Sequence, residues 1–229
     1  MNRQEIMLDN NEKCSLFDID MILEQCKTQL IIKRIFDIIL SSVGLVCLTP
    51  IFLLISIIIK IGSEGPVLFK QIRVGKNGKE FKILKFRTMV VDAENKGIQL
   101  TIGKDNRVTK VGYLLRKTKL DELPQLINVL NGDMSFVGPR PEVPKYVALY
   151  NGNQRNILKV RPGITDLASI KYRNENILLA KTVEPEKTYI EEIIPAKVAL
   201  NNQYLQNISV VNDLKIIIKT ILLLFMRSK

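Results

Sequence analysis

The chain of 229 residues contains no histidine and no tryptophan, and only three cysteines. Without histidine there can be no Ser-His-Asp triad, no Cys-His pair and no HExxH zinc site. Cys14, Cys26 and Cys47 have no metal-ligand spacing, so we expect free thiols on the reducing side of a membrane. Any chemistry must therefore be carried by carboxylates, Lys, Arg, Tyr, Ser, Thr, Cys or a metal ion bound by oxygens.

Charge is plentiful but unevenly distributed. The chain has 34 Lys+Arg and 23 Asp+Glu, a net charge of +11, and its 46% hydrophobic content excludes a disordered protein. Residues 60–117 hold fourteen basic and five acidic side chains, whereas residues 1–28 hold three basic and six acidic ones and are predicted to form a peripheral segment. The basic block suits anionic lipid. Nucleic acid is not an expected partner, because no helix-turn-helix, RRM or zinc pattern accompanies the charge.

Residues 38–59 contain no charged side chain and as a helix would cover about 33 Å, the thickness of a bilayer core. Thr49-Pro50 lies in the middle, where proline kinks or breaks a helix. Basic residues flank both ends, which favours a segment that enters and returns to the cytoplasmic side. We therefore predict a re-entrant helix-break-helix over residues 29–62, broken at Thr49-Pro50. A single spanning helix and a buried soluble helix are the alternatives.

Two further segments belong with the membrane. Asp37 lies three residues after Arg34, and we expect the two to pair at the interface. Residues 214–226 are apolar but interrupted by Lys215 and Lys219, which predicts an interfacial or core helix rather than a span.

A β-hairpin is predicted over residues 67–74 and 80–87, because Asn77-Gly78 lies between two runs of strand-forming residues. Its Lys and Arg side chains would gather on one face.

A helix is predicted to begin at about Asp121, with Pro124 in its first turn, and to stop at Asn131-Gly132. Asp121 and Glu122 would then lie at a helix N-terminus, which keeps a carboxylate ionised and attracts phosphate. Arg116 could contact a phosphate placed there. On local grounds alone, a capping role for Asp121 is the simpler interpretation. Two loops rich in Pro, Gly and Arg follow, at residues 136–142 and 160–165.

Taken together, these segments resemble the bacterial sugar transferase family, the monotopic phosphoglycosyl transferases. The resemblance covers residues 33–173, and its motifs keep the family order and spacing. The motifs are Arg73-Val74-Gly75, Lys85-Phe86-Arg87-Thr88-Met89, Leu115-Arg116-Lys117-Thr118, Asp121-Glu122-Leu123-Pro124-Gln125, Gly132-Asp133-Met134-Ser135, Val137-Gly138-Pro139-Arg140-Pro141-Glu142 and Arg161-Pro162-Gly163-Ile164-Thr165.

The resemblance implies an α+β fold, mainly α, with a re-entrant membrane helix, a small cytosolic α/β catalytic domain over residues 63–229, and interfacial helices. It implies a monotopic enzyme at the cytoplasmic face of the bacterial inner membrane. The reaction implied is transfer of a sugar 1-phosphate from a UDP-sugar to undecaprenyl phosphate with release of UMP, which begins synthesis of a lipid-linked glycan such as exopolysaccharide. Mg²⁺ is the implied cofactor, membrane lipids are implied partners, and a homodimer is possible.

Residue roles are carried over from the family motifs. Asp121 would be the nucleophile that forms a covalent aspartyl phosphosugar, with Glu122 handling metal or protons and Arg116 bracing phosphoryl oxygens. Asp121 and Glu122 would hold the metal ion. The candidates for substrate binding are Lys85, Arg87, Gln125, Arg140, Glu142 and Arg161.

One stretch departs from the family pattern. Residues 166–174 lack the Gly-Leu-Ala and Gly-Arg of many relatives, so the sugar is not inferred. The competing hypothesis from another class is a non-catalytic, membrane-tethered protein whose basic face binds anionic lipid or polymer.

Overall fold

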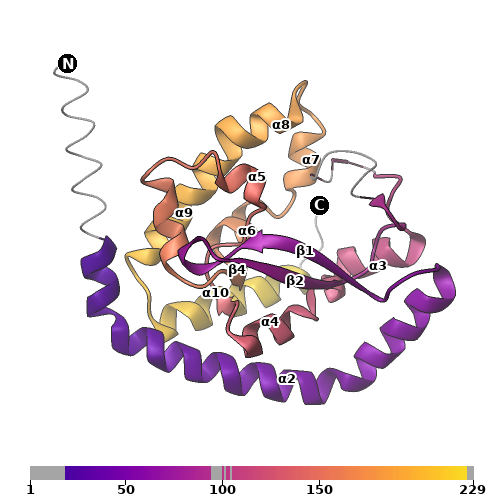
Figure 1. The fold of residues 1–229 in the computed structure, drawn as a ribbon, viewed down its shortest axis with the longest axis horizontal. Coiled ribbons are helices and arrows are strands. Elements are labelled where there is room, and N and C mark those ends of the chain that lie inside the picture. The colour runs from indigo at the N-terminus through magenta and orange to yellow at the C-terminus, as the bar shows by residue number, and fades with distance from the viewer. Residues whose placement is uncertain (1–18, 94–99, 101, 104, 226–229) are drawn as a thin grey trace.

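The computed structural model describes residues 19–93, 100, 102–103 and 105–225. The predictions for residues 1–18, including Cys14, lie outside the described residues. Within the part of the chain that the structure describes, helices dominate, and two small two-stranded sheets complete the predicted mainly α architecture. One long helix runs along one side of the molecule, next to α4 (Gln125–Asn131) and α10 (Val210–Phe225) (Figure 1).

The long helix, α2, extends over Lys27–Gly62, 36 residues, and is long and apolar enough to cross a membrane by length and composition. It is continuous through Pro50, so the predicted break at Thr49-Pro50 is wrong. The Thr49 hydroxyl donates to the carbonyl of Leu45 at 2.8 Å, within the turn before the proline. A proline together with such a back-bond bends a helix, and α2 curves visibly around the domain (Figure 1).

The first half of α2 is fastened to the domain by polar contacts. Arg34 donates to the carbonyls of Val129 and Leu130, at 2.6 and 2.9 Å. Asp37 accepts a hydrogen bond from the amide of Phe136 at 3.0 Å and is 4% exposed. Arg34 and Asp37 thus bind the domain rather than forming the expected pair, because buried main-chain groups need these partners.

The second half of α2 is fastened by apolar packing. Ile55 and Ile59 are buried in a cluster with Phe86 and Leu115. Both halves of α2 therefore rest on the same domain.

The predicted hairpin is confirmed. β1 (Leu68–Val74) pairs antiparallel with β2 (Glu80–Phe86), and the register runs from Leu68 opposite Phe86 to Val74 opposite Glu80. The 3₁₀ turn η1 (Lys76–Gly78) joins them, with Asn77 at φ 57° and Gly78 at φ 75°. Positive φ at both positions is what Asn-Gly tolerates best.

The segment around the acidic pair differs from the prediction. α3 (Lys110–Thr118) ends at Lys119, whose φ is 59°, and Leu120–Glu122 then forms a separate 3₁₀ turn, η3. α4 begins only at Gln125, after Pro124, because the amides of Glu122 and Leu123 bond to the carbonyls three residues before them and so close a 3₁₀ turn. The predicted stop is confirmed, since Gly132 caps α4 at φ 91°.

The two Pro-, Gly- and Arg-rich loops meet in a short parallel pair. β3 (Ser135–Val137) pairs with β4 (Gly163–Thr165). A Cβ atom added at Gly163 would lie 2.1 Å from the amide nitrogen of Gly138, so only glycine permits this approach. The intervening chain contains α5 (Pro144–Val147) and the 3₁₀ helix η4 (Gln154–Lys159).

The rest of the chain supplies helices that cover the core. They are α6 (Leu167–Lys171), α7 (Glu175–Leu179), α8 (Pro185–Thr188), the π-helical η5 (Tyr189–Ile193), α9 (Ile194–Leu205) and α10. Tyr146, Leu179, Tyr204 and Leu205 are at most 2% exposed and form the centre of the main core.

The last helix, α10, has two apolar faces. Ile216 is buried, whereas the residues of the opposite face are exposed, namely Val211, Leu214, Ile218, Ile221 and Leu222. One face packs into the core. The other provides the exposed apolar surface that the predicted interfacial helix needs.

Candidate active site

One large cavity, of about 2050 Å³, lies between the hairpin, the α3–η3 segment and helices α6 and α9. A pocket for one small ligand usually measures roughly 300–1000 Å³, so this cavity has room for more than one substrate. It brings together Arg116, Asp121 and Glu122 with three of the four predicted substrate-binding cations, Lys85, Arg87 and Arg140.

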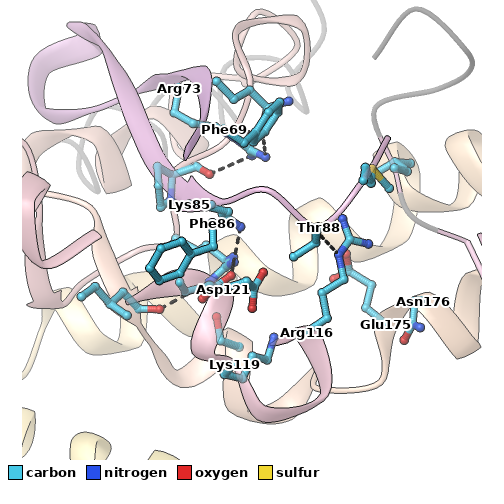
Figure 2. Close-up of a pocket in the computed structure, with 18 of the residues that line it drawn as sticks. Phe69, Arg73, Lys85, Phe86, Thr88, Arg116, Lys119, Asp121, Glu175 and Asn176 are labelled. Carbon is cyan, nitrogen blue, oxygen red and sulfur yellow. Dashed lines mark hydrogen bonds and ion pairs between the residues drawn. The ribbon is translucent and has the colours of Figure 1, made fainter. Parts of the chain in front are cut away.

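Asp121 lies at the wall of this cavity, between Lys85 and Lys119 (Figure 2). It is 6% exposed, and its Oδ1 atom is buried without a hydrogen-bond partner. Burial raises the pKa of Asp121, and the charge of Glu122 raises it further, while Lys85, Lys119 and Arg116 act in the opposite direction. A desolvated carboxylate with an unused oxygen, surrounded by cations, is suited to attack an electrophile.

Unlike Asp121, Glu122 has both of its carboxylate oxygens bound by cations. Arg140 donates to both of its carboxylate oxygens, with Nη1 3.3 Å from Oε2 and Nη2 bonded to Oε1, and Lys85 Nζ lies 3.0 Å from Oε1. Burial alone would raise the pKa of Glu122, but Arg140 and Lys85 outweigh it and hold that pKa well below its usual range. Glu122 is therefore ionised, and it fixes the positions of two cations beside Asp121.

Arg116 is oriented by the loop after the hairpin. Its Nε donates to the hydroxyl of Thr88 at 2.9 Å (Figure 2). Burial lowers the pKa of Arg116, and Asp121 is the strongest influence in the other direction. Because an arginine remains protonated in proteins, it adds a positive charge to the cavity near Asp121.

Arg87 and Glu142 line the cavity, but their polar atoms are engaged by the protein. Arg87 donates to the carbonyls of Ser63 and Glu64 at 2.8 and 2.7 Å. Glu142 accepts from Arg73 at 3.2 Å and from the hydroxyl of Tyr189. These contacts give both residues a structural task at the cavity wall.

Arg161 and Gln125 are absent from the described residues that line the cavity. Arg161 Nε donates to the carbonyl of Gly132 at 2.9 Å, which ties the loop before β4 to the end of α4. Gln125 is fully buried, and both polar atoms of its amide lack partners. The structure thus does not bring these two predicted residues to the cavity with the acidic pair.

Lys119 and Asp166 also lie in the site and were not predicted. Lys119 lowers the pKa of Asp121 and of Glu122 and occupies a left-handed conformation. Asp166 accepts from the amide of Arg140 at 3.1 Å and caps α6 by accepting from the amide of Ser169. An aspartate directly before a helix is a capping signal that sequence alone provides; nothing in the sequence marks Lys119.

A metal ion would have few protein ligands here. Within the described residues, no group of three or more Asp, Glu, Cys or His side chains is placed to hold one. Mg²⁺ commonly binds through one or two carboxylates and completes its shell with water and substrate phosphates. The unpartnered Oδ1 of Asp121 fits that arrangement, whereas Glu122 already holds Lys85 and Arg140.

The chain belongs to the bacterial sugar transferase family, whose model matches residues 28–227. This match confirms the predicted family resemblance and identifies the protein as a sugar transferase.

Curated relatives cover most of the chain. A UDP-glucose:undecaprenyl-phosphate glucose-1-phosphate transferase of Klebsiella pneumoniae is 43% identical over 84% of this chain and 40% of its own length. The exopolysaccharide production protein PSS of Rhizobium leguminosarum bv. phaseoli is 39% identical over 87% of this chain and 98% of its own length. A UDP-N-acetylgalactosamine-undecaprenyl-phosphate N-acetylgalactosaminephosphotransferase of Aeromonas hydrophila is 37% identical over 83% of this chain and 43% of its own length. This chain thus spans less than half the length of two of these relatives, whose names give different sugars.

Proposed function

We propose that this protein transfers a sugar 1-phosphate from a UDP-sugar to undecaprenyl phosphate and releases UMP. The names of the Klebsiella and Aeromonas relatives support the substrate class. The observation that carries the proposal is the buried carboxylate of Asp121, with an unused oxygen, in a cavity that also holds Lys85, Arg116 and Arg140.

The reaction proceeds in two displacements at one phosphorus atom. A carboxylate oxygen of Asp121 attacks the β-phosphorus of the UDP-sugar, the bond to the bridging oxygen breaks, and UMP leaves with that oxygen. A phosphate oxygen of undecaprenyl phosphate then attacks the same phosphorus, and the Asp121 carboxylate is released. The product is an undecaprenyl diphosphate sugar. Two steps let two anionic substrates use one cationic site in turn.

The cations of the cavity have separable tasks in this reaction. Arg116, held by Thr88, would bind oxygens of the transferring phosphoryl group. Lys85 and Arg140, held by Glu122, would offset the charge of the diphosphate. Mg²⁺ would be held by one carboxylate oxygen of Asp121 and by substrate phosphates, which leaves the other oxygen of Asp121 for attack. When bound, the ion would supply further neutralisation of phosphate charge.

UMP release from a UDP-sugar, in the presence of undecaprenyl phosphate and Mg²⁺, tests the proposal. Asp121→Asn is expected to lose more than 99% of this release while remaining folded. Asp20→Asn is the matched control, because Asp20 is exposed and pairs with Lys159 outside the cavity. Retention of release by Asp121→Asn would reject the nucleophile. No release by the wild-type protein, together with salt-sensitive binding to anionic vesicles, would favour the competing tethered binding protein.

We also propose that α2 enters the cytoplasmic leaflet and returns, so that the domain lies on the cytoplasmic face of the inner membrane. Both halves of α2 pack on one domain, through Arg34 and Asp37 at one end and Ile55 and Ile59 at the other. A helix that crossed the bilayer would place its two ends on opposite sides. The exposed apolar face of α10 adds a second element suited to the interface.

Single cysteines in a cysteine-free variant test this topology. Thr28→Cys and Ile61→Cys, both at exposed positions, are expected to react with a membrane-impermeant maleimide from the cytoplasmic side. In a third variant that keeps Cys47 as its single cysteine, this exposed residue on the middle of α2 is expected to be shielded from the maleimide by lipid. Labelling of Thr28→Cys and Ile61→Cys from opposite sides would reject re-entry.

A further inference from the structure

Two buried polar groups in the cavity have no role in the proposed phosphoryl chemistry. The side-chain oxygens Ser169 Oγ and Asn201 Oδ1 are both buried without hydrogen-bond partners, and both residues line the same cavity as Asp121. Asn201 is only 4% exposed. A buried polar atom without a partner destabilises a protein, so one that lines a cavity is suited to bind a polar group of a ligand there.

Ser169 is held at a fixed position relative to the acidic pair. Asp166 caps α6 by accepting from the Ser169 amide at 2.6 Å, and its other oxygen accepts from the Arg140 amide at 3.1 Å. Arg140 in turn holds Glu122. The main chain of Ser169 is thus linked to the acidic pair through Asp166 and Arg140, which fixes the position from which its hydroxyl extends.

Asn201 lies on α9, which packs against α6 and forms another part of the cavity wall. One turn earlier, Lys197 is paired with Glu175, and its Nζ lies 4.9 Å from the centre of the Tyr189 ring. Tyr189 donates to Glu142, which is bound to Arg73 of β1. The wall that carries Asn201 is therefore fixed to the hairpin.

The two parts of the cavity differ in the ligand groups they can bind. Around Asp121 the cations Lys85, Arg116 and Arg140 suit phosphate oxygens. Ser169 and Asn201 are uncharged and can both donate and accept, since a hydroxyl rotates and an amide can present either end. Uncharged polar groups of this kind match sugar hydroxyl and amide groups.

We propose that Ser169 and Asn201 bind hydroxyl or acetamido groups of the hexose in the UDP-sugar and thereby determine which sugar is accepted. The inference rests on the proposed function and assigns the sugar end of the same site. A site that hydrogen-bonds a substrate group discriminates strongly against an analogue without it, because the polar groups of the protein are then left unpaired.

The test compares Ser169→Ala and Asn201→Ala with the wild-type protein. UMP release is measured with UDP-glucose, UDP-galactose, UDP-N-acetylglucosamine and UDP-N-acetylgalactosamine, and UDP is used as a competitive inhibitor without a sugar. Each variant is expected to lower kcat/KM for the sugar preferred by the wild type roughly tenfold, with a smaller loss for the others. The inhibition constant of UDP is expected to stay the same.

Asn202→Ala is the matched control. Asn202 is the next residue of α9 and also has a buried Oδ1 without a partner, but it is absent from the described residues that line the cavity. Its replacement is expected to leave the order of sugar preference unchanged. Thermal unfolding of all three variants detects any loss of folding.

Three results would overturn the inference. The first is an unchanged sugar preference in both Ser169→Ala and Asn201→Ala. The second is an equal loss for all four sugars together with weaker UDP inhibition, which would show a structural role. The third is the same change of preference in Asn202→Ala. Failure of the wild-type protein to release UMP from any sugar would instead reject the proposed function, and the sugar assignment with it.

Discussion

Arg140 donates hydrogen bonds to both carboxylate oxygens of Glu122, while the neighbouring Asp121 keeps an oxygen without a partner. Two adjacent acids thus have opposite environments. The pKa of Glu122 is held well below its usual range, and that of Asp121 is raised by burial. This contrast separates a fixed anion that positions cations from a carboxylate available for reaction.

The pH dependence of activity should report Asp121. Attack requires its ionised form, so UMP release is expected to fall as the pH drops through a pKa higher than the ordinary aspartate value. Lys119 lowers this pKa, and therefore Lys119→Met should move the acidic limb of kcat/KM to higher pH. Lys79→Met, in the turn region of the hairpin outside the cavity, should leave the limb in place. If the acidic limb of kcat/KM moved equally in Lys119→Met and Lys79→Met, the assignment of this limb to Asp121 would be contradicted.

The two acids should also affect stability in opposite directions. The folded-state pKa of Asp121 is raised above its unfolded value of 3.8, so its ionisation costs stability at neutral pH, and this cost disappears below that unfolded value. Asp121→Asn is therefore expected to raise the free energy of unfolding at pH 7, because an uncharged side chain avoids this cost.

Glu122→Gln provides the opposite case. The depressed pKa of Glu122 stabilises the fold above the unfolded value near 4.5, and this contribution is lost as the pH falls through the folded value. The variant should lower the free energy of unfolding at pH 7, because Lys85 and Arg140 lose a buried partner. Denaturant unfolding of both variants is the measurement, and shifts of the same sign would refute the division of roles.

Gly112 allows α3 to approach the loop that orients Arg116. A Cβ atom at Gly112 would lie 2.0 Å from the carbonyl oxygen of Thr88, a main-chain contact that cannot move easily. Gly112→Ala should displace Thr88, lower UMP release at least tenfold and reduce thermal stability. Gly152→Ala is the control, because its Cβ would meet nothing within 4 Å. Equal UMP release and equal thermal stability in Gly112→Ala and Gly152→Ala would show that the close approach of α3 to Thr88 is not required for activity or folding.

Removal of divalent metal should abolish UMP release, and Mg²⁺ should restore it. The acidic pair offers few ligands, so Mg²⁺ is expected to bind much more tightly when a UDP-sugar supplies phosphate oxygens. Calorimetric titration with and without UDP-sugar tests this coupling. Full activity in excess EDTA would reject the proposed metal.

Local signals predicted those parts of the fold that depend on neighbouring residues. Asn77-Gly78 predicted the hairpin and Asn131-Gly132 the end of α4, since both require positive φ that few residues tolerate. The same kind of rule failed at Pro50, where a proline bends α2 without interrupting it.

The site shows where sequence reasoning ends. Lys85, Arg116, Asp121 and Glu122 were predicted and do meet in one cavity. Arg87 was predicted to bind substrate, but its guanidinium donates to the carbonyls of Ser63 and Glu64. The residue type alone could not reveal these contacts. Such contacts depend on tertiary packing between distant segments, and so do the buried groups of Ser169 and Asn201.

The attachment of α2 at both of its halves has a consequence for how the lipid substrate arrives. On the proposed topology, the domain cannot rise from or sink into the bilayer without breaking the contacts of Asp37 or those of Ile59. The depth of Asp121 relative to the lipid headgroups is therefore set by the helix itself. A lipid phosphate would reach the carboxylate by lateral diffusion in the leaflet, and the encounter becomes a search in two dimensions.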